Sequence, residues 1–311
     1  KKMFLSLSLP VSLVLAMFYA LVFVLSLYVW KGSTTADRNN PETIVRRLIS
    51  VSTVSVVSPF ILFLFDDATV DGPALLTWIG CSLDGIVNAA TLPLILTALL
   101  FLGPIFVYFL SSNNNLVQDV KDSFSEPNRL MSIRNYIVAP ICEEVVFRAV
   151  ICTVLVSGGW GYRAAGLLSP IMFGAAHLHH LIDHVKSRGL SLSQGALIVG
   201  FQLFYTTVFG IFASFLFLRT GHLVACCICH SFCNVMGFPA FDWLDPSSPH
   251  YDKRAIVSLT FVVGIILFSY CLYPLTNPSI YSSFVWNELP KLQAQNVTDA
   301  ASYKHRQFRM D

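Results

Sequence analysis

Charge is scarce in this sequence of 311 residues. Only 12% of the residues are Asp, Glu, Lys or Arg, whereas 55% are hydrophobic; soluble globular domains carry about 25% charged residues. The net charge is +2, and the basic residues are scattered between apolar runs. We therefore expect no nucleic-acid partner, because such proteins concentrate Lys and Arg in a patch. The composition argues against a soluble enzyme and predicts an integral membrane protein.

Familiar catalytic and metal-binding motifs are missing as well. The sequence has neither the G-x-S-x-G elbow of serine hydrolases nor an H-E-x-x-H zinc motif. Its eight cysteines do not form a zinc ribbon or a secreted disulfide framework. Four of them cluster around His230: Cys226, Cys227, Cys229 and Cys233. We interpret this cluster as small apolar packing residues on a helix.

Long apolar runs, by contrast, are abundant. A helix needs about 20 mostly apolar residues to cross a bilayer, and suitable runs occur near 3–30, 48–65, 85–110, 133–156, 163–182, 195–218, 221–240 and 255–276. We predict an all-α, polytopic membrane protein with about eight transmembrane helices enclosing an intramembrane catalytic cavity. Residues 1–311 form one integral membrane domain in this interpretation, with a motif-bearing core at 133–240 and a polar tail at 277–311.

Basic residues gather in the loops of one predicted face, at 31–47, 111–132, 183–194 and 241–254. The loop at 66–84 on the other face has four Asp residues and no Lys or Arg. An excess of Lys and Arg in short loops marks the cytoplasmic side of a membrane protein. The basic face is therefore predicted to be cytosolic.

Ionisable residues inside the apolar runs are the strongest functional signal. Each costs roughly 2.5–3.5 kcal/mol at bilayer depth on insertion scales, so such a residue is by default a functional-site hypothesis. Three separate runs carry them in the half nearer the basic face: Glu143, Glu144, Arg148, His177, His230 and Asn234. This convergence predicts a site that opens to the cytosol. A membrane transporter or scaffold is a weaker alternative, because polar residues of an ion path should reach both faces.

Helical spacing suggests how these side chains divide their work. Glu144 and Arg148 share a helix face and should form a buried ion pair. Glu143 points about 100° away and is free to face a polar cavity. Beside His177, Glu143 could take a proton from water and direct it at a carbonyl. Phe173, one turn before His177, should pack against the imidazole ring.

The third run can supply hydrogen-bond donors. His230 and Asn234 lie one turn apart on one helix face, where their N–H groups could stabilise the oxyanion that develops during acyl hydrolysis. Two His and one Glu are also the ligand set of thermolysin-like zinc enzymes. A zinc-dependent intramembrane protease that uses the same residues therefore stays open beside a reaction without a cofactor.

The order of these motifs resembles a known family. The strings A-P-I-C-E-E-V-V-F-R-A (139–149), F-G-A-A-H-L-H-H (173–180), R-T-G-H-L (219–223) and H-S-F-C-N-V-M-G-F-P-A (230–240) are similar to those of the CAAX protease and bacteriocin-processing superfamily. They look most like its eukaryotic branch, the type II CAAX prenyl endopeptidases, or Ras-converting enzymes. The resemblance runs from about residue 28 to residue 274.

This resemblance implies a glutamate-type intramembrane peptidase of the endoplasmic reticulum. Such an enzyme removes the last three residues from farnesylated or geranylgeranylated CAAX proteins, for example Ras-type GTPases. By resemblance, Glu143 and His177 activate water, His230 and Asn234 form the oxyanion hole, and the second glutamate and the arginine of the first motif have a supporting role. The family site is regarded as metal-independent.

Overall fold

The computed structural model describes residues 7–62, 76–110 and 115–281. All regular elements in these ranges are helical, which confirms the all-α prediction. Most of the predicted polar tail, residues 282–311, lies outside the described residues. Its first residues form a short 3₁₀ turn, Pro278–Tyr281.

Most of the predicted apolar runs correspond to a single helix. The long helices are α1 (Leu9–Ser26), α2 (Pro41–Leu62), α12 (Leu192–Thr220) and α14 (Arg254–Leu275). The shorter ones are α4 (Ile86–Leu100), α5 (Leu102–Leu110), α6 (Leu116–Ser123), α10 (Tyr162–Ala176), α11 (His180–Ile182) and α13 (Leu223–Met236). A continuous helical run also contains α7 (Arg129–Ile133), α8 (Ala139–Glu144) and α9 (Thr153–Ser157), joined by the π-helical turns Arg134–Val138 and Val145–Cys152.

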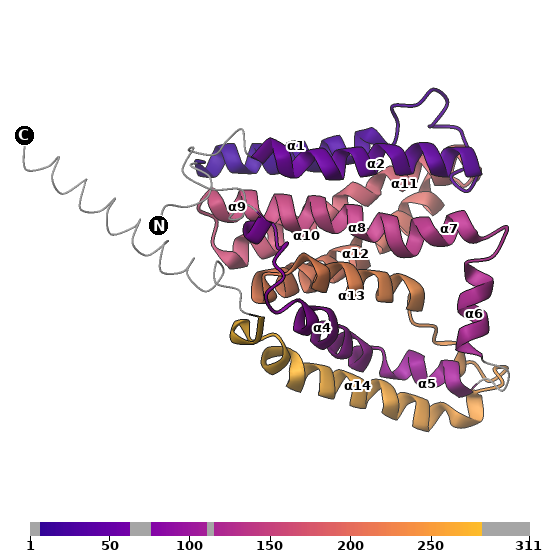
Figure 1. Ribbon diagram of the computed structural model, residues 1–311. Coiled ribbons are helices and arrows are strands. Elements are labelled where there is room, and N and C mark those ends of the chain that lie inside the picture. The colour runs from indigo at the N-terminus through magenta and orange to yellow at the C-terminus, as the bar shows by residue number, and fades with distance from the viewer. Residues whose placement is uncertain (1–6, 63–75, 111–114, 282–311) are drawn as a thin grey trace, which may run out of the picture.

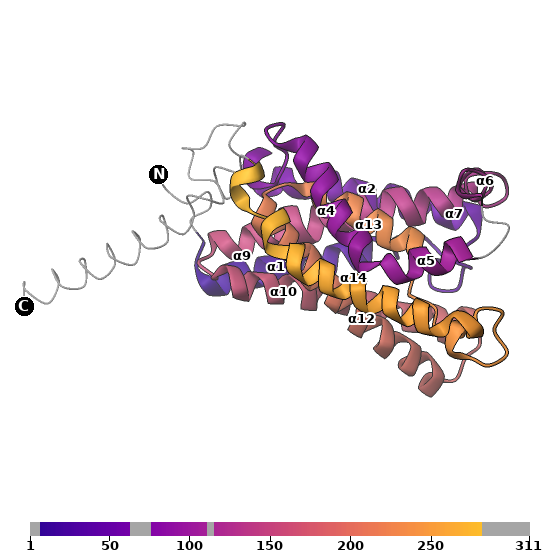
Figure 2. The same ribbon diagram turned by 90° about the horizontal axis from the view of Figure 1, so that it is seen from below.

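The helices stack in layers, as Figure 1 shows. The pair α1 and α2 covers one side of the run α7–α9, and α10 packs against α12. Helix α13 lies against α4, and α14 packs along α4 and α5 on the outer side. Seen from below, α14 runs beside α4 and α5 (Figure 2). The run α7–α9, which carries both glutamates, is therefore an inner element of the bundle.

Several helices are long and apolar enough to cross a membrane. Four qualify among the described residues: Leu9–Ser26, Pro41–Leu62, Leu192–Thr220 and Tyr251–Leu275. The pair α4 and α5 adds a fifth if the two helices form one bent span. A multi-pass membrane protein is thus confirmed, whereas the count of eight spans is not. Helix α13 has only 14 residues, fewer than a membrane span needs. It ends at Met236, and Gly237 follows with a φ of 67°.

Proline explains two interruptions of the helices. Helices α4 and α5 meet at an angle of 69°, and Pro104 lies in the first turn of α5. Its ring clashes with a carbonyl four residues earlier and it has no N–H to donate, so α4 cannot continue straight. Pro140 lies in the first turn of α8. Because it has no backbone N–H, it cannot donate a hydrogen bond to the carbonyl of Tyr136, which lies in the preceding π turn.

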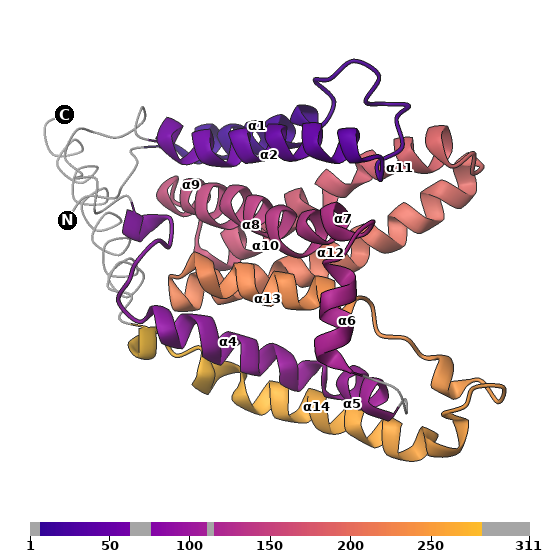
Figure 3. The same cartoon turned by 45° about the vertical axis from the view of Figure 1, so that its right-hand side comes forward.

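The loops that carry the basic residues lie together at one end of the bundle (Figure 3). Arg134 donates to the backbone carbonyl of Arg38 at 2.8 Å, and Arg47 lies 3.6 Å from Asp183. These contacts join three segments that are far apart in the sequence, at residues 38–47, at Arg134 and at Asp183. The predicted grouping of the loops is confirmed; which compartment they face stays a prediction.

Candidate active site

A cavity of about 800 Å³ opens within the bundle. Its lining includes five of the predicted site residues: Glu143, Phe173, His177, His230 and Asn234. The other two, Glu144 and Arg148, are completely buried behind this wall. The structure thus brings residues from α8, α10 and α13 to one place, as their predicted depths require.

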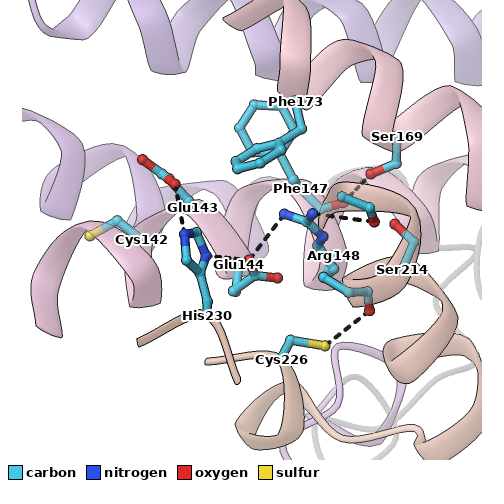
Figure 4. Close-up of polar contacts among 12 residues, drawn as sticks. Cys142, Glu143, Glu144, Phe147, Arg148, Ser169, Phe173, Ser214, Cys226 and His230 are labelled. Carbon is cyan, nitrogen blue, oxygen red and sulfur yellow. Dashed lines mark hydrogen bonds and ion pairs between the residues drawn. The ribbon is translucent and has the colours of Figure 1, made fainter. Parts of the chain in front are cut away.

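Glu144 is the centre of a buried polar network (Figure 4). Its Oε1 accepts a hydrogen bond from Arg148 Nη1 at 3.1 Å, as the spacing of the two residues predicts. The same oxygen lies 2.7 Å from His230 Nδ1, a contact that helical spacing alone could not reveal. Because a carboxylate only accepts, the His230 ring places its Nδ1 proton on this bond. Glu144 therefore fixes the orientation of the His230 ring.

Aromatic rings and a backbone carbonyl surround the Arg148 guanidinium. Its Cζ lies 4.5 Å from the centre of the Phe173 ring and 5.9 Å from that of Phe209. Its Nη2 donates to the carbonyl of Gly210 at 3.4 Å. A Cβ at Gly210 would lie 3.3 Å from that nitrogen and 3.0 Å from Pro170 Cβ, so a glycine lets α12 approach. These contacts hold an arginine that is fully out of water.

Glu143 faces the cavity, and its side chain retains 20% exposure. Its Oε2 lies 3.6 Å from His230 Nε2, so Figure 4 shows the two adjacent glutamates approaching one imidazole. The sequence placed Glu143 beside His177 instead. Both line the cavity, but no hydrogen bond or ion pair joins them in the described ranges. The reason is that α13 packs directly against α8, whereas His177 lies at the end of α10.

His177 is held by its own helix. Its Nδ1 lies 2.8 Å from the carbonyl oxygen of Phe173, and the two rings are 4.8 Å apart in an edge-to-face arrangement. The predicted packing of Phe173 on this ring is confirmed. A carbonyl accepts only, so Nδ1 carries the proton, and in the neutral ring Nε2 is an acceptor. His177 can therefore take a proton from water inside the cavity.

Asn234 is exposed to the open part of the cavity. Its Nδ2 donates to the backbone carbonyl of Asn135 at 2.9 Å. A primary amide has two N–H bonds, so the second remains for a ligand. The contact with Asn135 was not foreseen, because a backbone carbonyl in an apolar run has no sequence signature.

Further residues line the cavity that the motifs did not identify. His179 and His180 belong to the lining, as do Arg38, Arg47 and Arg134 from the basic end. The three arginines were visible in the sequence only as loop charges. That they reach the same cavity as Glu143 depends on the packing of the loops.

The cysteines near the cavity and the possible metal ligands bear on whether the predicted site contains a catalytic thiol or a metal-binding group, and the contacts of two cysteines are those of packing residues. Cys142 Sγ is directed at Ser52 Oγ of α2 at 3.8 Å, and Cys226 Sγ donates to the carbonyl of Ala213 at 3.3 Å. Both act as packing residues. Over the described residues, no three His, Cys, Asp or Glu side chains are grouped so as to hold a metal ion. Independence from a metal stays a prediction, because it concerns the reaction rather than this geometry.

The fold and the site together define a multi-pass helical membrane protein with a carboxylate–histidine centre inside its bundle. Residues 125–236 match the family model described as "Type II CAAX prenyl endopeptidase Rce1-like". The human protein named CAAX prenyl protease 2 is 39% identical over 269 residues, which are 84% of this chain and 80% of the human protein.

The plant relative extends the similarity. The Arabidopsis thaliana protein named CAAX prenyl protease 2 is 30% identical over 295 residues, 89% of this chain and 92% of that protein. No solved structure matches the chain. The chain belongs to the family of type II CAAX prenyl endopeptidases.

Proposed function

We propose that this protein is an endopeptidase of the endoplasmic reticulum membrane that removes the last three residues from prenylated CAAX proteins. Membership of the family supports the reaction. The cavity supports the substrate class, because aromatic and aliphatic side chains from α1, α2 and α12 line it next to the polar groups. A farnesyl or geranylgeranyl chain requires such an apolar surface, and a peptide requires the polar groups.

The observation that carries the proposal is that Glu143, His177, His230 and Asn234 share one cavity. In the proposed reaction, Glu143 takes one proton from a water molecule that His177 holds through Nε2, and the water oxygen attacks the carbonyl carbon of the prenylated Cys. Glu143 is the carboxylate that faces the cavity, and His177 offers Nε2 as an acceptor. The captured proton then passes to the departing amine as the C–N bond breaks.

His230 and Asn234 are proposed to stabilise the oxyanion. His230 can donate from Nε2 when its ring carries both protons, and Glu144 holds the ring in place through its contact with Nδ1 at 2.7 Å. Asn234 can donate its second N–H. Glu144 and Arg148 are positioning residues here, because both lie behind the cavity wall and act through His230. The basic end of the bundle is proposed to face the cytosol, where the protein tail enters.

The test is cleavage of a farnesylated CAAX peptide by purified protein, followed by mass spectrometry. We expect release of one intact tripeptide. Glu143→Gln keeps the shape of the side chain but cannot accept a proton, so the rate should fall by at least ~10²–10⁴-fold while the protein remains folded. Exposed Glu42→Gln is the matched control and should retain full activity. Substantial activity in Glu143→Gln would remove Glu143 from its proposed role.

A further inference from the structure

Three arginines line the cavity at the basic end of the bundle: Arg38, Arg47 and Arg134. Deeper in the same cavity, the carboxylate and imidazole groups form the candidate catalytic site. The proposed reaction uses none of the three arginines. Their surroundings show which of them could bind a ligand.

Two of the arginines are already engaged. Arg47 Nη2 donates to the carbonyl of Ser33 at 3.1 Å and lies 3.6 Å from Asp183. Arg134 donates to the carbonyl of Arg38, to Asn39 Oδ1 and to Asn135 Oδ1 at 2.8, 3.1 and 2.9 Å. Through these contacts Arg134 fixes the loop that carries Arg38 at the open end of the cavity.

The guanidinium of Arg38 has no hydrogen-bond or ion-pair partner within the described ranges. It is half-buried, and burial, followed by the nearby charges of Arg47 and Arg188, lowers the pKa of Arg38. Asp183 acts on it in the opposite direction, but that carboxylate lies close to Arg47 and His180. A half-buried cation without a partner is costly, and a bound anion would relieve the cost.

We propose that Arg38 binds the free α-carboxylate at the C-terminus of the substrate. The inference rests on the proposed function, because that substrate brings a carboxylate three residues beyond the bond to be cleaved. Arginine suits the task, since its planar N–H groups match a carboxylate in a two-bond arrangement. By anchoring the C-terminus, the contact would place the bond three residues before the chain end at the catalytic groups, so that a tripeptide is released.

The dimensions agree with this assignment. Arg134 and Glu143 are nine positions apart on one helical run, hence at most about 14 Å apart along its axis at the α-helical rise of 1.5 Å per residue. The hydrogen bond from Arg134 to the carbonyl of Arg38 places Arg38 at the outer end of this interval. An extended tripeptide spans about 10 Å. The long side chain of Arg38, which belongs to the cavity lining, can cover the remainder.

The experiment compares two farnesylated peptides that differ only in ending with a free acid or an amide. For the wild-type protein, amidation should lower kcat/KM by roughly 10- to 100-fold, the loss expected for a hydrogen bond between charged groups. Arg38→Gln should show a similar loss on the acid and no further loss on the amide. Arg38→Lys, which keeps the charge, should recover part of the acid preference. Arg188→Gln, which removes a nearby charge outside the cavity lining, is the matched control and should keep the full preference.

Several outcomes would overturn the assignment. Equal cleavage of acid and amide by the wild type, or an undiminished acid preference in Arg38→Gln, would show that Arg38 does not bind the α-carboxylate. An anionic lipid headgroup could supply the anion instead, so the assay is repeated in vesicles of phosphatidylcholine with and without phosphatidylserine. An Arg38-dependent response to phosphatidylserine, with the acid preference intact, would assign Arg38 to lipid. Failure of the wild type to cleave either peptide would contradict the proposed function itself.

Discussion

His230 Nδ1 lies 2.7 Å from Oε1 of Glu144, a carboxylate that is completely buried behind the cavity wall. The same carboxylate oxygen also accepts a hydrogen bond from Arg148 Nη1. One buried carboxylate thus neutralises an arginine and orients the imidazole that faces the cavity. Stability and activity are therefore coupled at Glu144, and the two effects can be separated by substitution.

Glu144→Ala and Arg148→Ala should each destabilise the protein, because each leaves a buried charge without its partner. Breaking a buried pair costs ~3–5 kcal/mol, so low expression and a lower midpoint of thermal unfolding in detergent are expected. The double variant Glu144→Leu with Arg148→Met removes both charges and should recover part of the stability. It should remain inactive, because His230 has lost its anchor. Single variants that are fully stable but inactive would instead place these residues in direct contact with the substrate.

Asn234→Ala should reduce kcat more than it changes KM. An oxyanion donor acts only as negative charge develops, and the loss of one donor typically costs ~10²–10³-fold in rate. Asn234→Asp has the same size but presents an acceptor in place of the amide, so its loss should be at least as large. Steady-state kinetics on a prenylated peptide separate the two parameters. A defect confined to KM would make Asn234 a binding residue.

Much of this site could be predicted from the sequence because it depends on local helical geometry. The pair of Glu144 and Arg148 and the packing of Phe173 on His177 both follow from a spacing of four residues. The contact between Glu143 and His230 does not, because it depends on how α13 packs against α8. The rings and carbonyl around Arg148, from Phe209 and Gly210, lie in a uniformly apolar run without any polar signal.

For the fold, too, some features follow from the sequence pattern and others do not. Apolar runs located the helices, since burial in lipid requires long hydrophobic stretches. The number of membrane spans could not be derived from these runs, because the chain bends at Phe101 between α4 and α5 and because α13 is short. Bends and early ends depend on single residues such as Pro104, which average hydrophobicity does not detect.

Cleavage should survive strong chelation. The proposal assigns stabilisation of the oxyanion to His230 and Asn234, so removal of divalent metal should leave kcat/KM unchanged. Activity is measured after prolonged treatment with EDTA and 1,10-phenanthroline, and the metal content of the purified protein is determined in parallel. A known zinc protease, treated in the same way, serves as the positive control. Loss of activity that added zinc restores, together with stoichiometric bound metal, would favour the zinc alternative.

The last prediction concerns the side of the membrane on which the site opens. Lys121 and Arg163 are both exposed and lie at opposite ends of the bundle, at α6 and at the start of α10 (Figure 3). In a variant whose exposed Cys81 is replaced by Ser, Lys121→Cys should react with a membrane-impermeant maleimide in intact microsomes. Arg163→Cys should react only after detergent is added, because the basic loops are predicted to face the cytosol. The reverse labelling pattern would place the mouth of the cavity in the lumen, where the tails of cytosolic prenylated proteins cannot reach it.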